Sequence, residues 1–212
     1  MYDFVNRAAS MNDEKTVASL DPILGGASWE SRLEPGLPRG RGVEKLFRDT
    51  LRQVGNFEYV ISTKIDRPTE DRPFFFIVYG TKSRDGLSAF RDIEYAALRA
   101  NARDRANAKE RKREFKTGSP DFFAGVEASI QELSIDEIVE AQKALAKQEL
   151  VEMLKDCDLK FSLVWTSLLQ AYMLRVTNIK DIFVELAKAG IIENTWGGGN
   201  RKPRDENVIR LK

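Results

Sequence analysis

Apolar residues recur at helical spacing along most of this chain. In the stretches 43–54, 87–98, 127–158, 161–173 and 179–187 they stand three or four positions apart, which places them on one face of a helix. Thr177 is a residue type that caps helix N-termini, and Gly190 suits the left-handed residue that ends a helix. The pattern therefore predicts a chain that is mostly α-helical.

Two stretches with a different pattern follow the first of these helices. Apolar residues alternate with polar ones over residues 57–65, and residues 74–79 form a continuous apolar run, which is typical of a strand buried on both faces. The charged loop between them holds two prolines and joins the strands as an antiparallel hairpin. Because two strands do not make a stable sheet alone, a homo-oligomer formed through the hairpin is one expectation.

The C-terminal stretch, 160–212, has its own order of elements: helix, tight turn, helix, strand, glycine-rich turn and strand. This order predicts a winged helix-turn-helix, with residues 197–199 in the turn. The predicted fold class is α+β, mostly α: a partial αβ layer with an antiparallel hairpin, long linker helices and the C-terminal winged helix. The expected organisation is a truncated αβ region over 1–116, a linker over 117–126 and a winged-helix domain over 127–212.

The charge of this C-terminal stretch is compatible with nucleic acid. It holds nine bases and five acids, a balance of +4. In a helix-turn-helix the second helix enters the major groove, and a basic wing reaches phosphates. The candidate nucleic-acid-binding residues are Lys180, Lys188, Trp196, Arg201, Lys202 and Arg204. The acids Asp181 and Glu185 on the second helix would repel phosphate, so a winged helix that docks a protein is the alternative.

A second basic segment lies in the middle of the chain. Residues 99–116 hold eight bases and three acids, a balance of +5. This arm is a secondary candidate for phosphate contact through Arg99, Arg103, Lys109, Arg111, Lys112 and Arg113. A solvated helix extension is the alternative, and pairing with the acidic stretch 127–158, whose balance is −6, is a third possibility.

Composition restricts the chemistry that the chain can perform. It contains no histidine and one cysteine, which excludes histidine-activated nucleophiles and zinc clusters in their usual forms. Carboxylates, lysine or tyrosine, with magnesium, remain as catalytic options. No glycine-rich phosphate loop is present, and we assign no cofactor, metal site or catalytic residue to this chain. No long apolar run predicts a membrane span, and the lone Cys157, which we expect to be buried, fits a cytoplasmic protein.

Several segments together resemble the three-Cys-motif partner proteins (TcmP). The resemblance rests on residues 2–7, the apolar run 74–79 with Thr81 and Lys82, Gly86 and Leu87, residues 90–92, and residues 117–123. It implies that a methyltransferase-like Rossmann half precedes the matching part in that family, that residues 1–116 are a Rossmann-like remnant, and that a protein with a three-cysteine motif is the partner. The chain would then be the C-terminal part of a family member.

The expected function is a non-catalytic module that contacts nucleic acid, most simply DNA, through its winged helix. One alternative is part of a methyltransferase-like or nuclease-like enzyme whose catalytic half is missing here. The other alternative is a winged helix that docks a protein partner.

Overall fold

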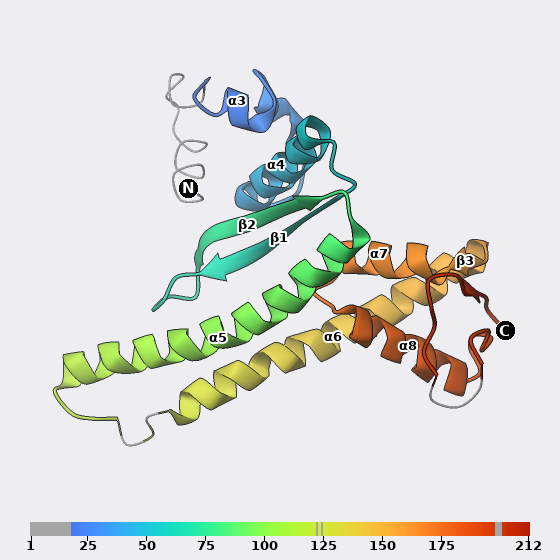
Figure 1. The fold of residues 1–212 in the computed structure, drawn as a ribbon. Coiled ribbons are helices and arrows are strands. Elements are labelled where there is room, and N and C mark those ends of the chain that lie inside the picture. Colours follow the sequence, from blue (N-terminus) through green and yellow to red (C-terminus); the bar gives the residue numbers. More distant parts are fainter. Residues whose placement is uncertain (1–17, 122, 124, 198–200) are drawn as a thin grey trace. The chain divides into compact units, whose positions relative to one another are not determined.

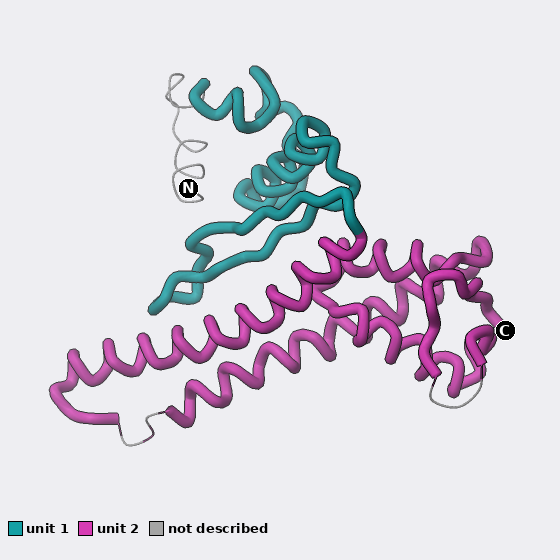
Figure 2. Tube along the Cα trace, in the orientation of Figure 1, with its two compact units in different colours: residues 1–83 teal, residues 84–212 magenta. Residues whose placement is uncertain are grey.

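The structure, a computed structural model, describes residues 18–121, 123, 125–197 and 201–212. It is mostly helical and contains a small antiparallel hairpin, so the α+β class is confirmed (Figure 1). The chain forms two compact units, Met1–Ser83 and Arg84–Lys212 (Figure 2). This division differs from the boundary at residue 116 that the charge pattern suggests, because the long helix α5 packs on α6 within the second unit.

The first unit is built around the amphipathic helix α4 (Arg39–Gly55). The short helix α3 (Asp21–Leu24) and the 3-10 turn η1 (Trp29–Arg32) pack on it. Their shared core consists of Leu20, Leu24, Trp29, Val43 and Leu46. Asn56, with φ of 48°, ends the helix in the left-handed conformation.

The predicted hairpin is present as β1 (Tyr59–Asp66) and β2 (Pro73–Thr81), paired antiparallel from Tyr59 opposite Thr81, with an irregularity between Ile65 and Asp66. The prediction that 74–79 is buried on both faces is wrong: Phe74 and Ile77 are 43% and 46% exposed. The run is apolar, yet within the described residues the sheet has only these two strands, which leave part of β2 in solvent.

The second unit begins with two long helices, α5 (Arg84–Thr117) and α6 (Val126–Asp156), which lie side by side and run antiparallel (Figure 1). The buried side chains of these two helices include the small or β-branched residues Ala106, Ala128, Ile135 and Val139. Small residues permit close approach of the two backbones. The basic stretch 99–116 lies in the C-terminal half of α5, and the helix that packs against α5 is the acidic α6.

The C-terminal elements are β3 (Leu159–Lys160), α7 (Phe161–Ala171), α8 (Val176–Lys188) and β4 (Val208–Ile209). β3 pairs antiparallel with β4, and Ile192 forms a single bridge with Leu211. The two helices pack through buried side chains, and the rings of Phe161 and Phe183 meet edge to face at 5.0 Å.

Local details of this region differ in part from the sequence pattern. The N-cap of α8 is Arg175 rather than Thr177, because the Asn178 Oδ1 accepts a 3.0 Å hydrogen bond from the Arg175 backbone N–H. Gly190 adopts the expected left-handed conformation with φ of 72°. Gly197 is also left-handed, whereas the rest of the expected glycine turn lies outside the described residues.

Candidate nucleic-acid interface

The helix α8 presents one face to the core and the other to solvent. Its buried residues are Ile179, Ile182, Phe183 and Leu186, which share one side of the helix. The opposite side carries Thr177 and Lys188, both exposed, with Lys180 and Asp181 partly exposed between them. The predicted basic residues of α8 are therefore accessible.

The segment 201–204 is tied to this helix by an ion pair. The Lys202 Nζ lies 2.6 Å from the Asp181 Oδ1 on α8, and each side chain is 45% exposed. Pro203, next to Lys202, is buried. The structure thus brings Lys202 of the predicted wing next to the predicted recognition helix, although Lys202 and Asp181 are about twenty positions apart in the sequence.

Trp196 has a packing role at the base of this segment. Its ring meets the Phe183 ring edge to face at 6.3 Å, and its Nε1–H donates a 2.8 Å hydrogen bond to the Arg201 carbonyl oxygen. A tryptophan held in this way fixes the backbone of Arg201 relative to α8. The ring is half-buried, so the structure places Trp196 as a support for the segment.

The acids on α8 are compensated by lysines. Asp181 pairs with Lys202, and Glu185 lies 3.4 Å from Lys147 and 4.0 Å from Lys143 on α6. Each of these ion pairs offsets part of the negative charge that would repel phosphate. The side chains of Lys188, Arg201 and Arg204 are exposed and make no ion pair with any described residue. Lys188, Arg201 and Arg204 are therefore candidate residues whose side chains are both exposed and outside any ion pair with the described residues.

Asp205 holds the segment 201–205 against α7 and α5. Its Oδ1 accepts a 2.9 Å hydrogen bond from the Trp165 indole of α7, and its Oδ2 lies 3.4 Å from Arg84 Nη1 of α5. The Asn207 Oδ1 accepts a 2.7 Å hydrogen bond from the Arg204 backbone N–H, which closes a turn. An aspartate followed two residues later by an asparagine is the only sequence signal for this anchoring, and it is typical of turns in general.

The secondary basic arm has a different environment. Arg99 and Arg103 pair with Glu132 of α6 at 3.1 and 4.0 Å, and Arg113 pairs with Glu127 at 2.6 Å. The expected pairing of the arm with the acidic stretch is confirmed for these three arginines. Among the other candidates, Arg111 and Lys112 are exposed and Lys109 is half-buried. Three of the six arm residues therefore hold α5 to α6.

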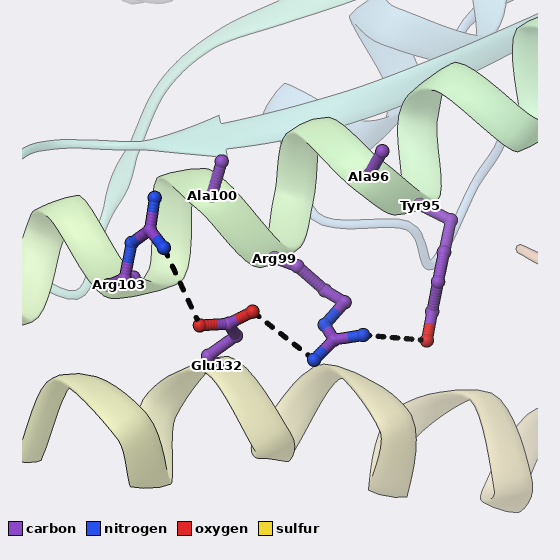
Figure 3. A pocket seen from close by; sticks show the side chains of 6 residues that line it. All are labelled: Tyr95, Ala96, Arg99, Ala100, Arg103 and Glu132. Atoms are coloured by element: carbon purple, nitrogen blue, oxygen red, sulfur yellow. Dashed lines mark hydrogen bonds and ion pairs between the residues drawn. The ribbon is translucent and has the colours of Figure 1, made fainter.

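A pocket of about 250 Å³ lies where these pairs form, lined by Tyr95, Ala96, Arg99, Ala100, Arg103 and Glu132 (Figure 3). The Tyr95 hydroxyl donates a hydrogen bond to Asp136, and this bond, with a smaller effect of burial, raises the pKa of Tyr95. The Arg175 guanidinium lies over the Tyr95 ring at 4.1 Å. The charged and hydroxyl groups that line the pocket are paired with one another or with Asp136. We therefore interpret the pocket as part of the contact that joins α5, α6 and the start of α8.

Cys157 lies between α6 and β3 and is exposed, so the expectation of a buried thiol is wrong. The end of α6 at Asp156 leaves the following residue in extended backbone, away from the core. In the described part of the chain, no group of three or more histidine, cysteine, aspartate or glutamate residues is arranged to hold a metal ion. None of the helices in that part is both long enough and apolar enough to cross a membrane.

Comparison of the chain with protein-family models, with curated proteins and with solved structures finds no match. The resemblance to the TcmP family stays a prediction.

Proposed function

We propose that this chain is a non-catalytic nucleic-acid-binding module whose C-terminal part, from the second half of α6 to Lys212, is a winged helix. The order of the elements supports this: α6, β3, α7, α8, the Ile192 bridge and β4. The helices α7 and α8 follow one another directly, β4 pairs with β3, and Ile192 pairs with Leu211. In this assignment α8 is the recognition helix, and residues 193–197 and 201–207 belong to the wing.

The observation that carries the proposal is the ion pair between Lys202 and Asp181. It holds the wing beside α8 and removes a negative charge from the helix face that would meet the duplex. Lys188 from the helix and Arg201 and Arg204 from the wing then form one set of exposed cations, which bind phosphates without sequence preference.

A charge-reversal experiment tests the proposal. The variant Arg201→Glu/Arg204→Glu changes the net charge by −4 and leaves the Lys202 pair intact. Titrated against a mixed-sequence DNA duplex, it should bind about tenfold or more weakly at 0.1 M salt, and its salt slope should fall by about 2. Fluorescence anisotropy at two salt concentrations gives both quantities.

The matched control is Lys82→Glu/Lys116→Glu, which changes the net charge by the same amount at exposed positions outside both sets of candidate residues. We expect it to bind DNA nearly as tightly as the unmodified chain. Equal weakening by both variants would mean that only net charge matters, and no DNA binding by the unmodified chain at low salt would contradict the proposal.

A winged helix that docks a protein is the second candidate, because the exposed side of α8 carries the two acids Asp181 and Glu185 besides its lysines. A face with both signs of charge suits a protein surface better than a polyanion. This function is the one supported if the duplex titration shows no binding and a partner protein co-purifies with the chain but not with the Asp181→Lys/Glu185→Lys variant.

A further inference from the structure

Phe115, in the last turn of α5, is 93% exposed, more than any other large apolar side chain among the residues that the structure describes. It lies on the outer side of the helix, because the buried Ala106 and Glu110 stand nine and five positions before it, on the opposite side. Between residues 99 and 117 it is the only large apolar residue. Both faces of its ring are therefore open.

Two cations flank this ring. Arg111 and Lys112 stand four and three positions before Phe115, so the three side chains are neighbours on one side of the helix. Both cations are exposed. They belong to the part of the basic arm that does not hold α5 to α6, unlike Arg113, which pairs with Glu127.

The acids closest to the ring are used inside the chain. The Glu110 Oε2 accepts a 3.3 Å hydrogen bond from the Gly125 backbone N–H, and the Glu114 Oε1 accepts a 2.8 Å hydrogen bond from the Asp121 backbone N–H. Both carboxylates thus bind the segment that connects α5 to α6. The surface around Phe115 consequently combines an open aromatic ring with positive charge.

We propose that Arg111, Lys112 and Phe115 form a site for single-stranded nucleic acid. An unpaired base stacks on the Phe115 ring, and the two cations bind the neighbouring phosphates. Proteins that bind single strands without sequence preference use this combination, because every base has a face on which a ring can stack. Stacking and phosphate contact are common to DNA and RNA.

The site is separate from the proposed duplex interface and does not rest on it. Arg84, at the start of α5, pairs with Asp205 beside the wing, and Phe115 follows 31 residues later (Figure 1). At the rise of an α-helix this separation is about 45 Å. The stacked bases of a duplex are closed to Phe115, so the two sites differ in the nucleic acid that they take.

The rest of this side of α5 is unsuited to a membrane surface. Asn101, Asp104 and Ala108 precede Phe115 by fourteen, eleven and seven positions and therefore share its side of the helix. A helix that lies on a membrane presents a continuous apolar face to the lipid. One ring among polar and small residues is not such a face, and its flanking cations favour an anionic partner with groups that stack.

Fluorescence anisotropy of the full chain with labelled oligo(dT), and with oligo(U) of the same length, tests the proposal. Phe115→Ala should bind about tenfold more weakly, because it loses one stacked base. Arg111→Gln/Lys112→Gln should also bind more weakly, and its salt slope should fall by about 1.4. Phe115→Trp, which keeps a flat ring, should bind at least as tightly as the unmodified chain. Dependence on Phe115 for only one oligonucleotide would identify that nucleic acid as the ligand.

The matched control is Ile93→Ala, on the same helix. Ile93 is 67% exposed, and the residues four and three positions before it, Ala89 and Phe90, carry no charge. This variant should bind the oligonucleotides like the unmodified chain. Phe115→Ala should bind a duplex of the same length with unchanged affinity.

The same comparison in the Arg201→Glu/Arg204→Glu background removes binding of single strands by the wing. The effect of Phe115→Ala should persist there, so failure of the wing assignment is distinguishable from failure of this site. The absence of binding to either oligonucleotide at low salt would overturn the proposal. Equal affinities of the chains with and without Phe115→Ala, in both backgrounds, would overturn it as well.

A tryptophan at the site gives a direct signal. The fluorescence that Phe115→Trp adds to that of the unmodified chain should be quenched by oligo(dT), whereas the fluorescence added by Ile93→Trp should not. Quenching by vesicles of anionic phospholipid, or by polyglutamate, without quenching by either oligonucleotide would overturn the proposal in favour of a membrane or an acidic protein.

Discussion

Arg91 is a buried cation that joins the long helices to the C-terminal module. Its side chain is 5% exposed; Nη1 donates to Glu94 at 2.5 Å, and Nε and Nη2 donate to the Leu169 carbonyl oxygen at 2.8 and 2.5 Å. Leu169 lies in the last turn of α7, where carbonyl groups have no partner within the helix. The Arg91 guanidinium therefore balances the charge of the buried Glu94 carboxylate and hydrogen-bonds to a carbonyl group at the end of α7.

Replacement of Arg91 should be strongly destabilising. Arg91→Ala removes the buried ion pair with Glu94 and both hydrogen bonds to the Leu169 carbonyl oxygen, and we expect a loss of about 3–5 kcal/mol in the free energy of unfolding, measured by urea denaturation. The control Lys155→Ala breaks an exposed pair with Glu152 and should cost less than about 0.5 kcal/mol. Similar losses for both variants would show that the buried pair has no special role.

Tyr172, just after α7, should make stability depend on pH in the alkaline range. Its hydroxyl donates a 2.5 Å hydrogen bond to Glu149, and this bond, followed by burial, raises the pKa of Tyr172 to about 12. Because the folded-state pKa exceeds the ordinary value of 10, the protonated tyrosine stabilises the fold fully below about pH 10 and loses this effect as the pH rises toward 12.

The variant Tyr172→Phe should lose about 1 kcal/mol at pH 8 and should show a smaller decline of stability between pH 10 and 12 than the unmodified chain. Urea denaturation at pH 8, 10 and 11 measures both effects. Parallel pH profiles of the two proteins would contradict the assigned hydrogen bond.

At the scale of elements, the junction between α4 and the hairpin depends on two glycines. A Cβ added at Gly80 of β2 would lie 2.5 Å from the Phe57 ring, and one added at Gly55 would lie 2.2 Å from it. The ring thus occupies space that any other residue at these positions would fill. Phe57 follows directly after the left-handed Asn56, which turns the chain from α4 toward β1.

Gly80→Ala should therefore destabilise the chain by about 1–3 kcal/mol through overpacking. The double variant Gly80→Ala/Phe57→Ala should be less destabilised than the sum of the single variants, because the smaller side chain removes the clash. As a control, Gly42→Ala in α4 places its Cβ 3.5 Å from Leu33 and should stabilise by about 0.5–1 kcal/mol. Thermal denaturation of all four variants decides the point.

The α5–α6 pair shows how charge pattern and structure are related at this scale. The basic arm and the acidic stretch suggest a partner for each other because their charges are opposite and both follow helical periodicity. The structure joins them through Arg99, Arg103 and Arg113, whereas the pattern alone left open nucleic acid, solvent and the acidic helix as partners. The choice depends on which residues of two antiparallel helices lie opposite each other, and no local rule supplies that register.

The amino-acid sequence by itself determined the helices, the hairpin and the limits on chemistry. Helical and strand periods arise from side chains a few positions apart, so 87–98 and 161–173 could be read as helices without knowledge of their partners. The absence of histidine is likewise a property of composition alone.

Only the tertiary structure decided which surfaces meet. The two-residue strands β3 and β4 are too short to have a period, and their pairing joins residues about fifty positions apart. The partners of Asp181 and Asp205 and the exposure of Cys157 likewise depend on contacts between distant segments. Local periodicity shows that a side chain prefers to be buried, whereas the packing of the rest of the chain determines what buries it.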